Sequence, residues 1–262
     1  MYFVLQIFNT YDDVLMTVIA FIAFILAVYF AIIPHEVAHG LVAKWNGDLT
    51  AKVNGRLTLN PVSHFDPIGF LMLLFMGFGY AKPVPVNPYN FKVPRRGLFT
   101  TAIAGVTYNF AAMIVCCLFL AIVMAVGILG QTAFAVYSYY FFYWFFWLGA
   151  SINVSLLLLN LIPLGPLDGF KVIEAFAERD NAFIGFLRRN GNYILFFLFA
   201  LHFLVAYISM YLPAPQWLQY VDILGLYIKY GSLGIAGSIQ QLFNLIFGVP
   251  VSGWDAIGYL YL

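Results

Sequence analysis

The sequence predicts an all-α protein that crosses a membrane several times, and two observations predict this fold class. Hydrophobic residues make up 63% of the 262 residues and charged residues only 9%, whereas a soluble domain is typically about 45–50% apolar and about 25% charged. Several apolar runs also reach the roughly 20 residues that a transmembrane helix needs. A soluble globule of this size could not cover its surface with so few charges.

The charge balance and the cysteines exclude other classes of protein. The formal net charge is +1, so the chain has no basic field that could hold a nucleic acid backbone. The two cysteines, Cys116 and Cys117, are adjacent in an apolar run, and one such pair cannot form a disulfide framework. We therefore expect contact with the lipid bilayer and none with nucleic acid.

The apolar runs give the predicted spans in chain order. The first span, near residues 14–45, begins with twenty residues that carry no charge. We interpret it as a retained helix, because a secretory signal peptide would have a basic segment before its apolar core. Further spans are expected near 98–129 and 137–163. Residues 191–262 are expected to add C-terminal transmembrane helices, the least clear of them at 221–247.

Residues 46–97 are expected to enter and leave the membrane on one side. Their apolar part, 68–80, is too short to span comfortably and holds three glycines, which favours a short re-entrant or β-hairpin segment. Eleven of the twelve basic residues lie in three segments, 44–56, 82–96 and 171–189. The positive-inside rule makes these segments cytoplasmic, so the N-terminus is expected outside.

The motif H-E-V-A-H at 35–39 is the candidate catalytic centre. On a helix, His35 and His39 are four residues apart and share one face, so both rings can bind one metal ion, most often zinc. Glu36 can then reach a metal-bound water and act as the general base. Chance matches to this motif occur, but three polar side chains at the end of an apolar helix are costly and favour a shared site.

A third ligand is expected elsewhere in the chain, because catalytic zinc commonly has three protein ligands and an open position. Asp168 follows the third span on the side to which the first span delivers His35 and His39, so the topology can bring these residues together. A helix N-cap is the alternative role for Asp168. His64 is a possible accessory residue: a spare ligand, a substrate contact or, by default, a loop strut.

Pro34 directly precedes the motif. A proline within a helix leaves the carbonyl four residues back without its donor, so the carbonyl of Phe30 needs water or another partner. A local opening beside a metal and a tolerated kink both fit this position.

Four motifs occur in a fixed order: HEVAHG at 35–40, GRLTLNPVSHFDPIGF at 55–70, GYAKPVPVNP at 79–88 and NLIPLGPLDG at 160–169. Together they resemble the site-2 protease family of intramembrane zinc metalloproteases, peptidase family M50. The resemblance covers about residues 15–180. It implies a metalloprotease core within residues 1–190, in the compact form without a PDZ or CBS domain.

The resemblance also implies the roles of single residues. It matches His35, His39 and Asp168 to the ligands of one zinc ion per chain, and Glu36 to the general base. It matches Asn160 to an asparagine near the active site, where the amide could bind substrate or an oxyanion. An interhelical hydrogen bond is the alternative for Asn160.

The sequence departs from the family at one position. Where members often show Ala-Gly-Pro followed by an asparagine three residues later, this chain has Ala104-Gly105-Val106 and Asn109.

The implied activity is hydrolysis of peptide bonds in or near the transmembrane segments of membrane proteins, that is, regulated intramembrane proteolysis. The expected partner is a membrane protein with a transmembrane helix. The expected place is a bacterial cell membrane, with the active site toward the cytoplasm. A metal transporter, or a metal-binding protein without protease activity, is the alternative, but it predicts polar residues on several helices, and the later helices hold few. The oligomeric state is left open.

Overall fold

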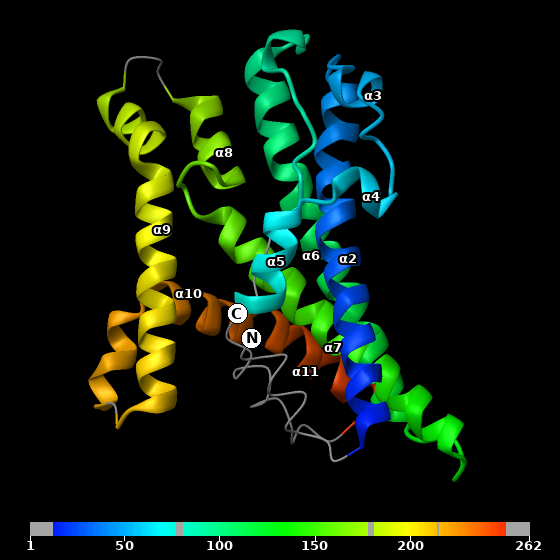
Figure 1. The fold of residues 1–262 in the computed structure, drawn as a ribbon. Helices are drawn as coiled ribbons and strands as arrows, with labels where there is room; N and C mark the ends of the chain where they lie inside the picture. The colour runs from blue at the N-terminus through cyan, green and yellow to red at the C-terminus, as the bar shows by residue number, and fades with distance from the viewer. Residues whose placement is uncertain (1–12, 77–80, 178–180, 214, 250–262) are drawn as a thin grey trace.

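Four long helices dominate the structure, a computed structural model that describes residues 13–76, 81–177, 181–213 and 215–249. Regular structure in these ranges is entirely helical, which confirms the all-α prediction. Each of the four runs in the opposite direction to the long helix before it (Figure 1), and each is long and apolar enough to cross a membrane. They are α2 (Val14–Trp45), α6 (Pro94–Val126), α7 (Ala133–Leu161) and α9 (Ala182–Tyr211).

Helices α2, α6 and α7 form the central bundle. Small residues recur every three or four positions on α2, and Ala20, Ala23, Ala27 and Ala31 are each no more than 1% exposed. Small side chains let helix backbones approach closely, as interfaces between membrane helices require. Larger side chains from the other two helices fill the remaining space: Leu120 from α6, and Trp147, Leu148 and Ile152 from α7.

The short re-entrant or β-hairpin segment expected at residues 68–80 is not supported. The described part of this segment is a helix, α5 (Pro67–Met76), and residues 77–80 lie outside the described residues. The backbone N–H of Gly69 donates to the carboxylate of Asp66, and proline at the first position suits a helix start. The apolar run that follows lacks the alternation of a half-buried strand.

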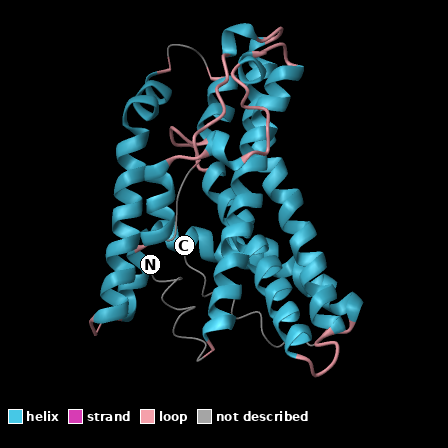
Figure 2. Cartoon of the chain, turned by 45° about the vertical axis from the view of Figure 1, so that its right-hand side comes forward, coloured by secondary structure: helices cyan, strands magenta, loops and turns pink. Residues whose placement is uncertain are grey.

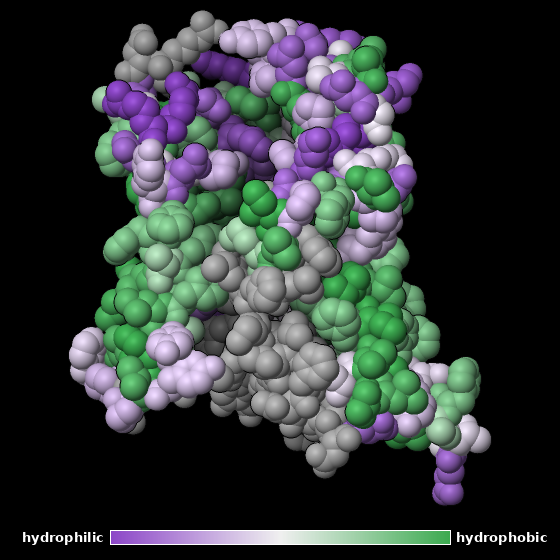
Figure 3. Space-filling view, viewed as in Figure 1, coloured by the Kyte–Doolittle hydropathy of each residue, from purple (hydrophilic) through white to green (hydrophobic). Residues whose placement is uncertain are grey.

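Short helices frame the hydrophilic end of the bundle. Figure 3 shows hydrophilic residues gathered where α2 ends and α6 begins, above a band of hydrophobic side chains. The described parts of the three basic segments all belong to this end (Figures 1 and 2). The short helices are α3 (Thr50–Val53), α4 (Pro61–His64), η1 (Pro88–Asn90) and α8 (Asp168–Phe176).

The described helices that follow α9 do not continue the pattern of long spans. α9 stands beside the three-helix bundle (Figures 1 and 2) and packs Ile184 and Leu187 against Leu164 and Phe170. The run at 221–247 is broken into short elements that lie obliquely across the bundle rather than along it. These are α10 (Ile223–Ser232), the π-helical η3 (Leu233–Gly237) and α11 (Ser238–Phe247), and the short η2 (Gln216–Val221) precedes them.

Candidate metal centre

The two motif histidines lie one turn apart on α2 and face the interior of the protein. His35 and His39 are each 7% exposed. Their Nε2 atoms are 3.0 Å apart, and the ring planes are nearly perpendicular. The helix thus places both rings on one face, as the four-residue spacing predicts.

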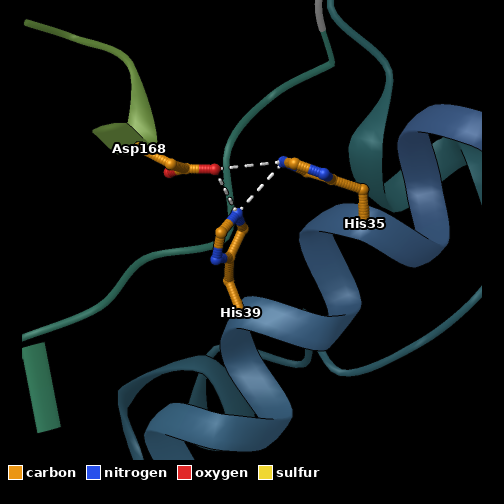
Figure 4. Close-up of side chains that lie close together, drawn as sticks. All are labelled: His35, His39 and Asp168. Atoms are coloured by element: carbon orange, nitrogen blue, oxygen red, sulfur yellow. Dashed lines mark hydrogen bonds and ion pairs between the residues drawn. The ribbon is translucent and has the colours of Figure 1, made fainter. Parts of the chain in front are cut away.

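Asp168 lies beside the two histidines although it is distant from them in the sequence (Figure 4). It is the first residue of α8, and its side chain does not cap that helix. Its Oδ2 instead lies 3.0 Å from Nε2 of His39 and 3.5 Å from Nε2 of His35. The topology therefore brings together the three residues that the sequence singles out as ligands, and all three are buried.

The other carboxylate oxygen of Asp168 binds Lys171, whose Nζ donates to Oδ1 over 2.9 Å. Burial alone would raise the pKa of Asp168. The Lys171 ammonium beside Oδ1 opposes this rise in pKa by favouring the ionised carboxylate. The carboxylate is therefore ionised, with Oδ1 engaged and Oδ2 directed at the histidines.

The partner of Nδ1 in each histidine decides which ring nitrogen carries the proton. Nδ1 of His39 lies 2.6 Å from the carbonyl oxygen of Thr101, and a carbonyl can only accept, so Nδ1 carries the proton. Nδ1 of His35 lies 2.5 Å from the amide oxygen of Asn109, which gives it the same tautomer. In the neutral form of each ring, Nε2 therefore presents a lone pair to the other ring and to Asp168.

The two Nε2 atoms and Oδ2 of Asp168 are three buried acceptor atoms in contact with one another, and they repel unless a cation lies between them. Oδ2 of Asp168 is buried and has no hydrogen-bond partner. A proton on any one of these atoms leaves two acceptors facing each other, whereas a divalent cation relieves all three contacts. Ligands about 2.0–2.1 Å from a tetrahedral zinc are separated by about 3.3 Å, close to the 3.0–3.5 Å found here. The donor set of two imidazoles and one carboxylate fits zinc.

Gly105 lets α6 approach the two rings. A Cβ atom at this position would overlap Nε2 of His39 and the ring of His35. The residue lies one turn beyond Thr101, whose carbonyl binds His39. The lack of a side chain is therefore what allows α6 to pass against the centre.

Glu36 lies beside the centre, partly buried, and is held by a backbone group. Its Oε2 accepts a hydrogen bond from the N–H of Val84 over 2.9 Å. Val84 packs against α2, since a Cβ on Gly40 would overlap its side chain. The extended chain around Val84 thus fixes one carboxylate oxygen of the residue expected to act as the base.

The remaining two candidates lie apart from this group. Nε2 of His64 is 2.8 Å from the carbonyl oxygen of Thr58, and Lys82 N–H donates to the carbonyl of His64. These contacts favour a loop strut over a spare ligand. The amide of Asn160 donates to the carbonyl of Leu156 within α7, so its role at an active site stays a prediction.

Sequence reasoning missed two buried amides behind His35. Asn109 on α6 is 0% exposed and Asn153 on α7 is 2% exposed. Asn109 entered the sequence analysis only as part of a family pattern, and Asn153 did not enter it. The available signal was their chemistry, because an amide inside an apolar helix needs a partner.

Comparison with known proteins gives one relative. No family model matches the chain, and no solved structure matches it. A Bacillus subtilis (strain 168) protein named "Putative zinc metalloprotease YwhC" is 41% identical over 140 residues. The match spans 53% of this chain and 62% of the relative's length.

Proposed function

We propose that this protein is an intramembrane zinc metalloprotease of the site-2 type, with one zinc ion per chain. The observation that carries the proposal is the buried convergence of His35, His39 and Asp168, three potential ligand atoms that a single proton cannot reconcile. The relative named as a zinc metalloprotease supports the same chemistry. Glu36, next to His35 in the sequence, supplies the base that such an enzyme needs.

Zinc bound here would lower the pKa of a coordinated water toward about 7 and polarise a peptide carbonyl. Glu36 accepts the proton of the attacking water and passes it to the leaving amine. The Val84 N–H holds one of its oxygens and leaves the other for this transfer. Burial of the two histidines and Asp168 keeps the ligands away from competing bulk water.

The position of the centre supports action at the membrane. α2 has 32 residues, or about 48 Å at 1.5 Å per residue, which exceeds the roughly 30 Å of a hydrocarbon core. Its motif at 35–39 lies in the last third of the helix, toward the end of the bundle where hydrophilic residues gather (Figure 3). We place this end on the cytoplasmic side of a bacterial cell membrane, and take membrane proteins with a transmembrane helix as the substrates.

The metal-transporter alternative is not favoured. A transport path needs binding groups along its length. In the described ranges, three or more potential ligands from His, Cys, Asp and Glu come together at one place, the candidate centre.

The replacement Glu36→Gln tests the proposal. We expect the purified variant to keep about one zinc per chain by elemental analysis. Its cleavage of a single-span test protein in detergent, followed by mass spectrometry, should fall about 10²–10⁴-fold or more, the usual contribution of a general base.

The matched control is Glu174→Gln, which removes a carboxylate that pairs with Arg188 away from the centre and should keep activity. Wild-type turnover in Glu36→Gln would contradict the base assignment. A wild-type protein that binds no zinc when supplied with it would contradict the metalloprotease itself.

A further inference from the structure

We propose that Asn153 is a positioning residue that acts through Asn109 to hold His35 in its metal-binding tautomer. The inference rests on the proposed function, since it concerns how this chain prepares a zinc ligand. It starts from a chain of side-chain hydrogen bonds that crosses the bundle from α7 through α6 to α2.

The chain has four links. The amide nitrogen of Asn153 donates to the carbonyl of Gly149 over 2.7 Å. The amide nitrogen of Asn109 donates to the oxygen of Asn153 over 2.8 Å and to the carbonyl of Ala31 over 3.1 Å. The oxygen of Asn109 lies 2.5 Å from Nδ1 of His35.

The backbone carbonyls at the ends fix the direction of every link, because they can only accept. The Gly149 carbonyl requires the NH₂ of Asn153, which turns the Asn153 oxygen toward Asn109. That oxygen and the Ala31 carbonyl both require the NH₂ of Asn109. The oxygen of Asn109 is then left to face His35, whose Nδ1 must carry the proton.

The reversed arrangement would disable the site. If Asn109 turned over, its NH₂ would face Nδ1 of His35 and its oxygen would face two other acceptors. His35 would then carry its proton on Nε2, the nitrogen directed at His39 and Asp168. A protonated Nε2 cannot bind a metal ion.

Burial removes the usual alternative partner, water. Asn109 and Asn153 are 0% and 2% exposed, so a broken link leaves a polar group unpaired in an apolar bundle. His39 needs no such device, because its Nδ1 bonds directly to a backbone carbonyl. The two amides therefore do for His35 what one carbonyl does for His39.

The test measures zinc affinity by chelator competition, and the absorption spectrum of the cobalt-substituted protein, for Asn153→Leu. We expect zinc affinity to fall on the order of 10-fold, as for other residues that orient a metal-binding histidine, and the cobalt bands to shift.

Ser151→Ala is the matched control. Ser151 is buried on the same helix, and its hydroxyl donates to the carbonyl four residues back, as the Asn153 amide does. It should leave zinc affinity and the cobalt spectrum unchanged.

Thermal melting separates positioning from packing. A packing role would lower the melting temperature of Asn153→Leu equally with and without zinc, whereas a positioning role shrinks the rise that zinc causes. Wild-type affinity, an unchanged cobalt spectrum or an unchanged zinc-induced rise would overturn the inference while the metal site stands. A wild-type protein that binds no zinc would instead overturn the proposed function.

Discussion

A residue without a side chain, Gly105, constrains the candidate metal centre as closely as the candidate ligands do. Because Gly105 has no side chain, the backbone of α6 lies directly against both histidine rings. We expect Gly105→Ala to abolish zinc binding, or to weaken it at least about 100-fold, because the added methyl group falls where Nε2 of His39 lies. Elemental analysis after equilibration with zinc measures the loss.

The control for Gly105→Ala is Gly185→Ala on α9, where a Cβ atom meets nothing within 4 Å. That variant should bind zinc like the wild type. Full zinc occupancy in Gly105→Ala would show that α6 can withdraw from the rings.

Asp48 is a buried residue whose ionised carboxylate stabilises the fold. Its carboxylate is 0% exposed and accepts hydrogen bonds from Thr50, Asn87 and Asn90, joining the end of α2 to the following loops. Burial raises its pKa, but these bonds outweigh burial and lower the pKa below the ordinary value of 3.8. The ionised carboxylate therefore stabilises the fold at pH values above about 4, and this stabilisation is lost as pH falls through the lower pKa of the folded state.

Asp48→Asn should lose about 1–3 kcal/mol of stability at pH 7, since hydrogen bonds to a charged group are replaced by weaker ones and one donor lacks an acceptor. The difference from wild type should shrink as pH falls below 4. Melting curves in detergent at pH 7 and pH 3 give both numbers. An equal difference at the two pH values would contradict the ionic origin of the effect.

At the scale of elements, α6 supplies a partner for a carbonyl of α2 that lacks its helical donor. Pro34 leaves the Phe30 carbonyl without its donor in α2, and the hydroxyl of Tyr108 supplies one over 2.6 Å. The sequence predicts that this carbonyl needs a partner, and the structure confirms it with a side chain 78 residues away. The next carbonyl, that of Ala31, accepts from the neighbouring Asn109.

A double-mutant cycle tests this arrangement. Tyr108→Phe should cost about 1–2 kcal/mol, because the Phe30 carbonyl is left unpaired. In a Pro34→Ala background the same change should cost little, because the restored N–H of residue 34 serves the carbonyl. Equal costs in both backgrounds, measured by thermal melting, would show that the tyrosine acts elsewhere.

At the scale of the whole molecule, the charge distribution predicts an orientation. The described basic segments share one end of the bundle, and the loop between α6 and α7 lies at the other (Figure 1). We expect Lys52→Cys, at an exposed site, to react with an impermeant thiol reagent only from the cytoplasmic side. We expect Leu129→Cys, 74% exposed, to react only from the other side.

The background for both cysteine variants replaces Cys116 and Cys117 with alanine. Inside-out and right-side-out vesicles supply the two sides. The opposite labelling pattern would place the metal centre at the outer face and contradict the cytoplasmic assignment.

The sequence by itself determined the features that depend on residues close together along the chain. Apolar runs of about 20 residues predict helices at membrane depth, and the spacing of His35 and His39 predicts one shared face. The sequence also singled out Asp168 as the third candidate ligand, for a different reason. Few acidic residues lie near an apolar run, and the direction of each span limits which of them can meet the histidines.

Only the tertiary structure decided which groups face each other across helices. The amides of Asn109 and Asn153, the carbonyl of Thr101 and the close passage of Gly105 depend on the rotation and separation of α2, α6 and α7. These are set by packing over many residues, and no local pattern records them. The same reason explains α5, where a short apolar run fits a helix or a strand until its neighbours are known. The sequence thus singled out the candidate ligands His35, His39 and Asp168, whereas their tautomers and their room for a metal ion depend on the folded bundle.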